Sequence, residues 1–272
     1  MLPRYLVLDV DDTLTINGRL RPLSLAALER AAGAGMEVVL NTGRSAGWGA
    51  ALLAYLPGVS AVVVENGGAW LDRRLSHSDE VQVQFRCPPG PDLRARLARL
   101  RQTVAQELGL ELQPTADDAF RLTDHTVVRT LPGGQVGAEA VRELAQAVAK
   151  HSGGGAHVLA SSVHIHFFWD GDRPRSKAEG VLALLRRRGL SDPEAELAHW
   201  AVAVGDSGND ASLFVPGRFA LAAAVRNIER YLPELGPCVP RYVTCAPEGL
   251  GLAELIDDLL GGRLGLEPPS RV

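Results

Sequence analysis

The sequence predicts an α/β protein with a Rossmann-like parallel-sheet core and an inserted, smaller α/β cap domain. Short apolar runs rich in β-branched residues alternate with longer segments of helical period, which is typical of βαβ units. A middle stretch interrupts this alternation with two amphipathic helices and strand-like segments of its own. We therefore expect a first core part at 1–81, a cap at 82–171 and a second core part at 172–272.

The elements expected before the insertion form a βαβ unit followed by a further helix and strand. They are strands at 5–10, 36–43 and 61–68, and helices at 24–35 and 47–56. Ser24 is expected to cap the first helix.

The insertion and the return to the core are expected to contribute the remaining elements. The insertion is expected to contain helices at 91–109 and 137–155 and strand-like segments at 120–130, 156–160 and 162–169. After the insertion, we expect a helix at 178–189, a strand at 200–208, a short helix at 209–217, a strand at 219–225 and a closing helix at 252–262. Polar, turn-forming stretches at 72–80 and 170–175 are the expected hinges.

Composition restricts the classes of function. The chain has 272 residues, of which 46% are hydrophobic, enough to bury a sizeable core. Its net charge of −4 gives no general attraction for nucleic acid or for an anionic membrane, and no apolar run is long enough to span a membrane. Cys87, Cys238 and Cys245 lack metal-ligand spacing and are expected to be free thiols. We expect a cytoplasmic protein with no nucleic-acid or membrane partner.

Acidic residues follow the expected strands at the edge where an open parallel sheet gathers its ligands. Asp9 and Asp11 follow the first strand, and Asp206 and Asp210 follow a late one. Alone, the first group could be only a turn and helix-capping cluster. Together, two such charges about 4 Å apart would cost roughly 4 kcal/mol at an effective dielectric near 20. Carboxylate oxygens without His or Cys favour Mg²⁺, which takes phosphate oxygens as further ligands.

Donors for a phosphate group accompany these acids. Thr42 offers a hydroxyl, and Gly43 allows close approach of the backbone. Lys177 begins a predicted helix, and only two of the 28 basic residues are lysines, which suggests a site that needs a compact ammonium. Alone, a lysine at a helix start is more often solvated.

Four segments carry a family resemblance. "DVDDT" at 9–13, "NTGRS" at 41–45, Lys177 and "VGDSGNDASLF" at 204–214 resemble, in order and spacing, the four motifs of the haloacid dehalogenase superfamily of phosphatases. The insertion resembles the α/β cap of the group with Cof-type sugar phosphatases, sucrose-phosphate phosphatase and mannosyl-3-phosphoglycerate phosphatase, and "VVVENGGAWL" at 62–71 resembles the strand and turn that lead into it.

The resemblance implies a role for each motif residue. Asp9 would be the nucleophile that forms an aspartyl-phosphate, and Asp11 the general acid and base, with its backbone carbonyl on the metal. Asp9, Asp11, Asp206 and Asp210 would hold Mg²⁺. Thr42, Gly43, Arg44, Lys177 and Asn209 would bind the phosphate or the substrate.

Several positions remain open to more than one interpretation. Asp12 stands where the family often has glycine, and we expect it to preserve the turn as a local acceptor. Arg44 could contact the substrate or bridge surface elements. His164 and His166, on one face of a predicted strand, could border the pocket or be structural, as could Arg121, Asp124, His125 and Arg129.

The predicted function is Mg²⁺-dependent hydrolysis of a small phosphate ester, a sugar phosphate or a glycosyl-glycerate phosphate. Two alternatives are open: a phosphotransferase like the phosphomannomutases, whose first motif is similar to "DVDDTLT", and a catalytically silent sugar-phosphate sensor. The short fourth motif favours the phosphatase over the mutase, and a sensor would be expected to have lost Asp9, Asp11 or Lys177.

Overall fold

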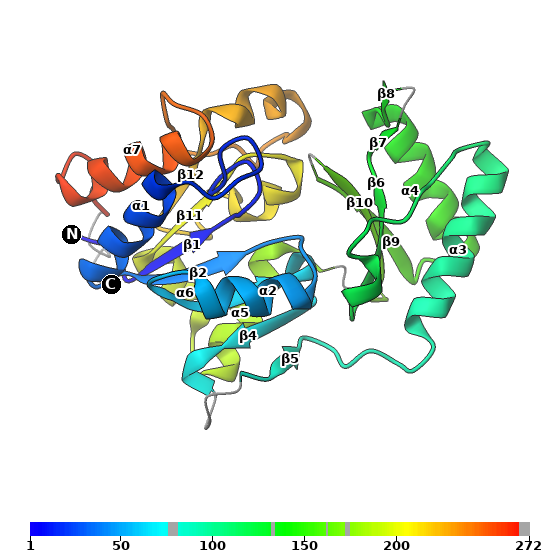
Figure 1. The fold of residues 1–272 in the computed structure, drawn as a ribbon, viewed down its shortest axis with the longest axis horizontal. Coiled ribbons are helices and arrows are strands. Elements are labelled where there is room, and N and C mark those ends of the chain that lie inside the picture. Colours follow the sequence, from blue (N-terminus) through cyan, green and yellow to red (C-terminus); the bar gives the residue numbers. More distant parts are fainter. Residues whose placement is uncertain (76–80, 132–133, 162, 172–174, 267–272) are drawn as a thin grey trace.

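Two units of different size lie side by side in the computed structural model, joined by two connections (Figure 1). Residues 1–75, 81–131, 134–161, 163–171 and 175–266 are described. The larger unit, the core, contains an eight-stranded sheet in the order β13-β12-β11-β1-β2-β3-β4-β5, and the smaller unit, the cap, contains a three-stranded sheet in the order β6-β10-β9. None of the described helices combines the length and hydropathy needed to cross a membrane.

The core sheet is parallel from β13 to β3 and antiparallel at β4 and β5. Its strands are β1 (Tyr5–Leu8), β2 (Glu37–Asn41), β3 (Val59–Val64), β4 (Ala69–Asp72), β5 (Val83–Phe85), β11 (Ala201–Gly205), β12 (Leu221–Ala224) and β13 (Tyr242–Val243). The predicted first boundary, before residue 82, is too early, because β5 pairs with β4 through residues 83–85 and so belongs to the core sheet.

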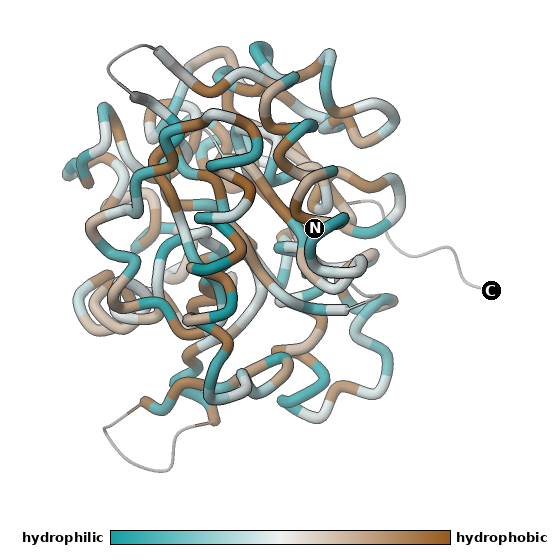
Figure 2. Tube along the Cα trace, turned by 90° about the vertical axis from the view of Figure 1, so that its right-hand side faces the viewer, coloured by the Kyte–Doolittle hydropathy of each residue, from teal (hydrophilic) through white to brown (hydrophobic). Residues whose placement is uncertain are grey.

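Helices cover both faces of the core sheet because the strands are apolar on both sides. Leu6 and Leu8 of β1 pack with α1 (Pro22–Gly33), α2 (Ala46–Tyr55) and α7 (Glu248–Leu260), while Tyr5 and Val7 pack with α5 (Lys177–Arg187) and α6 (Pro193–Trp200). Hydrophobic and hydrophilic residues alternate over short distances along the trace, as expected for elements with one buried side (Figure 2).

Three details of the helices differ from the prediction. Ser24 lies inside α1 rather than at its cap, since Pro22 occupies the first turn and Arg21 is the N-cap residue. Helix α6 was not expected; Asp192 caps it by accepting a hydrogen bond from the Ala195 amide. The short helix expected at 209–217 is a 3₁₀ segment, Gly208–Leu213.

The cap presents its sheet to the core and its helices to the far side (Figure 1). Its main elements are α3 (Leu93–Leu108), β6 (Asp124–Val128), α4 (Ala138–Ser152), β9 (Ala156–Ala160) and β10 (His164–Trp169), with a small hairpin of β7 (Thr130–Leu131) and β8 (Gly134–Gln135). Ile165 and Phe167 of β10 enter the hydrophobic core under α3 and α4. The alternate residues, His164 and His166, therefore face the core unit. The expected hinges fall partly on 76–80 and 172–174, which lie outside the described residues.

Candidate active site

The carboxyl ends of three neighbouring strands place the predicted motif residues together. β1 lies between β2 and β11, and its ladder continues one step further through a hydrogen bond from the Asp9 amide to the Val204 carbonyl at 3.0 Å. Asp9 follows β1, Thr42 follows β2, and Asp206 follows β11. Side chains 33 to 197 positions apart in the sequence therefore meet at one edge of the sheet.

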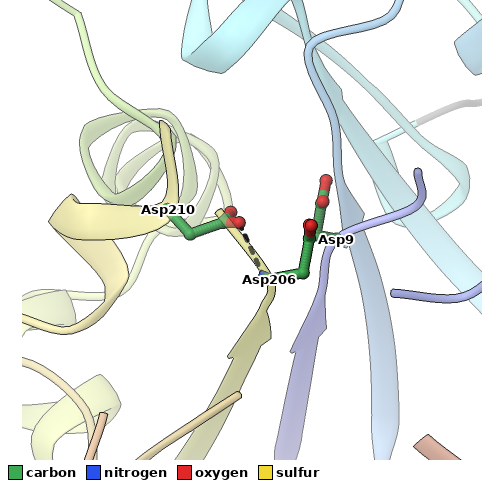
Figure 3. Close-up of side chains that lie close together, drawn as sticks. All are labelled: Asp9, Asp206 and Asp210. Atoms are coloured by element: carbon green, nitrogen blue, oxygen red, sulfur yellow. Dashed lines mark hydrogen bonds between the residues drawn. The ribbon is translucent and has the colours of Figure 1, made fainter. Parts of the chain in front are cut away.

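Three buried carboxylates form the centre of the site. Oxygen atoms of Asp9, Asp206 and Asp210 all lie within 4.8 Å of one another, and Figure 3 shows the side chains facing a common space. Two backbone hydrogen bonds hold the Asp210 carboxylate in place: its Oδ2 accepts from the amide of Asp206 at 2.9 Å and from the amide of Ser207 at 3.1 Å. An all-carboxylate donor set without His or Cys suits a hard divalent cation such as Mg²⁺.

Lys177 supplies the positive charge of this cluster. Its Nζ donates to Asp9 Oδ1 and to Asp210 Oδ1, each at 2.6 Å, and its side chain is fully buried. Burial alone would lower the pKa of Lys177, but the attraction of Asp210 and Asp9 outweighs burial and raises it. Lys177 is thus a permanent cation at the position that the motif predicted, the first residue of α5.

One lysine does not balance three carboxylates. Burial raises the pKa of Asp9 to about 7, with Lys177 opposing the shift and Asp210 adding to it. Burial, Asp9 and Asp210 together raise the pKa of Asp206 well above its ordinary value. The cluster by itself therefore retains protons, and a divalent cation would release them.

Asp11 stands apart from the carboxylate cluster and is held by Arg44. The Nε and Nη2 atoms of Arg44 donate to the two oxygens of Asp11 at 2.8 and 2.6 Å, and its guanidinium lies 5.0 Å from the Trp48 ring centroid. Of the two roles expected for Arg44, contact with the substrate or a bridge between elements, the structure shows a bridge to Asp11. Asp12 adopts the left-handed conformation, with φ of 58°, as expected for a residue in the place of glycine.

The loop after β2 is tightly packed around Gly43. A Cβ at that position would lie 3.1 Å from Asn66 Nδ2 and 3.2 Å from Cε1 of His166 in the cap. Thr42 is buried, and its Oγ1 accepts a hydrogen bond from the Arg44 amide at 3.1 Å. The backbone of this loop is thus tightly packed between core and cap.

Asn209 is held by two side chains that sequence reasoning did not single out. Ser207 Oγ donates to Asn209 Oδ1 at 2.8 Å, and Asn209 Nδ2 donates to Asn66 Oδ1 at 3.2 Å. The Nδ2 of Asn66 is buried without a partner among the described residues. Both Glu65 and Asn66 have positive φ, near 52°, and the "ENGG" sequence after a strand was the only signal for this strained turn.

Glu65, which sequence reasoning also did not single out, connects the cap to the core through hydrogen bonds. Its carboxylate accepts hydrogen bonds from the Ala46 amide at 3.1 Å, the Leu122 amide at 3.0 Å, and the amide and hydroxyl of Thr123, both at 2.6 Å. Arg121 makes a second contact across the junction, donating to the Gly43 carbonyl at 2.9 Å. Buried polar groups thus join the two units beside the active site.

The cap closes a small cavity over the carboxylates. Its lining comprises Asp9, Asp11, Gly43, Ser207 and Asn209 from the core and Ser161, Val163, His164 and His166 from the cap. The volume is about 10 Å³, room for about one water molecule. The two histidines therefore border the pocket. Arg121, Asp124, His125 and Arg129 are buried rather than solvated, with exposed fractions of 8% or less.

Known proteins are similar to this chain over nearly its whole length. No protein-family profile matches it. A phosphoglycolate phosphatase from Pyrobaculum neutrophilum is 30% identical over 264 residues, which cover 95% of this chain and 96% of that protein.

Solved structures share the fold at low sequence identity. A protein from Thermoplasma acidophilum has a TM-score of 0.69 at 18% identity, covering 96% of this chain and 99% of that one. A haloacid dehalogenase-like hydrolase from Bacteroides thetaiotaomicron reaches 0.64 at 17%, with 94% and 99% coverage, and a subclass IIB sugar phosphatase of the superfamily reaches 0.61 at 18%, with 95% and 99%. The chain belongs to the haloacid dehalogenase superfamily and is a phosphoric monoester hydrolase.

Proposed function

We propose that this enzyme hydrolyses a small phosphate ester with Mg²⁺ and an aspartyl-phosphate intermediate. The observation that carries the proposal is the fully buried Lys177, bonded at 2.6 Å to both Asp9 and Asp210 among three carboxylates at the strand ends. A bound Mg²⁺ would be held by Asp9, Asp206, Asp210 and the Asp11 carbonyl, and would neutralise charge on the phosphoryl group.

Asp9 is the proposed nucleophile. One of its oxygens forms a bond to phosphorus while the bond from phosphorus to the leaving oxygen breaks, so that one difficult hydrolysis becomes two displacements. Lys177, Thr42 and the Gly43 backbone stabilise the negative charge of the transferring group, and Asn209 orients the loop from the opposite side.

Asp11 is the proposed general acid and base. It gives a proton to the leaving oxygen in the first displacement and takes one from the attacking water in the second. Because Arg44 occupies both oxygens of Asp11, this ion pair has to loosen before the carboxyl can transfer a proton. Arg44 is thus proposed to release Asp11 when a substrate enters between the cap and the core.

The substrate is proposed to be small because the cap lies directly over the site. Sugar phosphates and glycosyl-glycerate phosphates are the first candidates, and the subclass IIB sugar phosphatase among the structural neighbours supports this class. Phosphoglycolate is the second, supported by the name of the relative from Pyrobaculum. A cap that opens and closes over such molecules would exclude bulk water from the intermediate.

Phosphate release tests the proposal. We expect release from one or a few esters in a panel of sugar phosphates, glycosyl-glycerate phosphates, phosphoglycolate and nucleotides, with Mg²⁺ and not with chelator. Asp9→Asn should abolish it, whereas Asp257→Asn, which alters an exposed aspartate paired with Arg30, should not. Release that persists in chelator or in Asp9→Asn would refute the metal or the nucleophile. Phosphate moved between two positions of a sugar, without release, would establish a mutase.

A further inference from the structure

His166 lines the catalytic pocket and has a ring nitrogen without a hydrogen-bond partner among the described residues. The alternation of β10 sends Ile165 and Phe167 into the cap core and His166 toward Asp9 and Asp11, with which it lines the cavity. Its imidazole is 1% exposed, and Cε1 lies 3.2 Å from the place of a Cβ on Gly43. Its Nε2 has no hydrogen-bond partner among the described residues.

Asp124 determines which nitrogen of His166 carries the proton. His166 Nδ1 lies 3.0 Å from Asp124 Oδ2, and Arg121 Nη1 donates to both Asp124 oxygens at 3.1 Å. Burial alone would raise the pKa of Asp124, but Arg121 and His166 hold it well below its ordinary value. The ionised carboxylate can only accept, so Nδ1 of His166 is the donor.

The other nitrogen is therefore an acceptor. Burial lowers the pKa of His166 despite the hydrogen bond to Asp124, so the ring is neutral and Nε2 carries a lone pair. His164, which borders the same cavity, is also neutral, because burial, His166 and Arg44 lower its pKa to about 4. A ligand that enters the cavity therefore meets two uncharged imidazole rings from the cap.

A hydroxyl group matches this environment better than a carboxylate. An unpaired buried acceptor destabilises the site, and a ligand that donates a hydrogen bond to it removes this cost. A carboxylate cannot donate, and it would need a nearby cation. The described residues that line the cavity include no lysine or arginine. The cations beside it already have partners: Arg44 pairs with both oxygens of Asp11, and Lys177 with Asp9 and Asp210. Arg121 is engaged with Asp124, Asp117 and Gly43.

We propose that His166 Nε2 accepts a hydrogen bond from a free hydroxyl group of the leaving alcohol, so that the enzyme selects phosphate esters of polyols or sugars. Esters without a second hydroxyl, and esters with a carboxylate such as phosphoglycolate, are the disfavoured classes. The inference rests on the proposed phosphatase function and specifies its substrate class. Asp124 and Arg121 are positioning residues, since they fix the tautomer and orientation of the ring.

A pair of minimal esters tests the hydroxyl contact. 2-Hydroxyethyl phosphate and ethyl phosphate differ in the hydroxyl alone, and we expect the wild type to favour the former in kcat/KM by about 10- to 100-fold. His166→Phe should bring this ratio near one. His166→Gln, whose amide oxygen can replace Nε2 as an acceptor, should retain part of it.

His125 provides the matched control. Like His166 it is a buried cap histidine hydrogen-bonded to an aspartate, at 2.9 Å from Asp118, with an unpaired Nε2. It lies on the opposite face of the cap sheet, 6.3 Å from the Phe167 ring, and does not line the cavity. His125→Phe should therefore leave the substrate ratio unchanged, and circular dichroism should verify the fold of each variant.

Each result separates this inference from the phosphatase itself. Equal turnover of the two esters by the wild type, or equal losses on both in His166→Phe, would overturn the hydroxyl contact and leave the phosphatase intact. A preference for phosphoglycolate that His166→Phe removes would show a protonated ring, which also overturns it. No release from any ester of the larger panel would overturn the proposed function and, with it, this subsite.

Discussion

Removal of the proposed Mg²⁺ should make the stability of the protein depend steeply on pH between about 4 and 7. Burial raises the pKa of Asp9 from an ordinary 3.8 to about 7, so in chelator the folded protein holds a proton that the unfolded chain has lost. A group of this kind stabilises the fold at low pH, and its contribution falls as pH rises from about 4 to 7. At 1.36 kcal/mol per pH unit, the loss is about 4 kcal/mol.

Mg²⁺ should oppose this dependence because it is proposed to bind the carboxylates in their ionised form. Urea unfolding at pH 5, 6, 7 and 8, with Mg²⁺ and with chelator, gives the free energy of unfolding under each condition. The two curves should approach each other at pH 5 and separate by several kcal/mol at pH 8. Groups far from the cluster contribute equally to both curves, and so the difference isolates the metal site.

Asp9→Asn is the matched variant, because it removes the titrating carboxyl and keeps its shape. In chelator its curve should be flatter than that of the wild type between pH 5 and 7, with a residual slope from Asp206, whose pKa is also raised. Asp257→Asn should retain the wild-type slope. Parallel curves with Mg²⁺ and with chelator, or an unchanged slope in Asp9→Asn, would refute the linkage of metal, proton and fold.

Three further substitutions test single contacts. Asp9→Asn should reduce turnover to below about one thousandth of wild type while circular dichroism stays unchanged. Asp11→Asn should reduce kcat far more than it weakens Mg²⁺ binding measured by calorimetry, since only its carbonyl is proposed to hold the ion; equal losses would exclude it as the acid and base. Glu65→Gln turns an amide NH₂ toward the donors of Leu122 and Thr123, and should cost about 1–3 kcal/mol in urea unfolding, whereas an unchanged midpoint would show that the cap is fastened elsewhere.

The core half of the site was predictable because its signals are local. Three of the four motifs follow a strand, and parallel strands end at one edge, so the sequence indicated where Asp9, Thr42 and Asp206 meet. The start of α5 at Lys177 followed from its helical period. What the sequence could not predict was the ion pair of Asp11 with Arg44, because nothing in a sequence states which of several nearby charges a flexible arginine will reach.

The cap half depends on register, which polar residues in a strand leave undetermined. "FRLTDHTVVRT" suited a solvated face as well as a substrate-facing one, and the structure adopts neither in full. β6 instead buries Asp124 toward the core and His125 toward the cap helices, because Thr126 pairs with His166 and Phe167 with His125. A shift of one residue in β10 would exchange His164 and His166, which line the pocket, with Ile165 and Phe167, which do not.

The contacts across the junction are expected to couple closure of the cap to the Gly43 loop, which is proposed to bind phosphate. Arg121 donates hydrogen bonds both to Asp124, the partner of His166, and to the Gly43 carbonyl. The same arginine therefore helps to orient His166, the proposed specificity residue, and holds the loop that is proposed to bind phosphate. A cap that swings away must break this bond and withdraw His166 together with it. A ligand that satisfies His166 therefore favours the arrangement in which the Gly43 loop is held, which links recognition of the leaving group to assembly of the phosphate site.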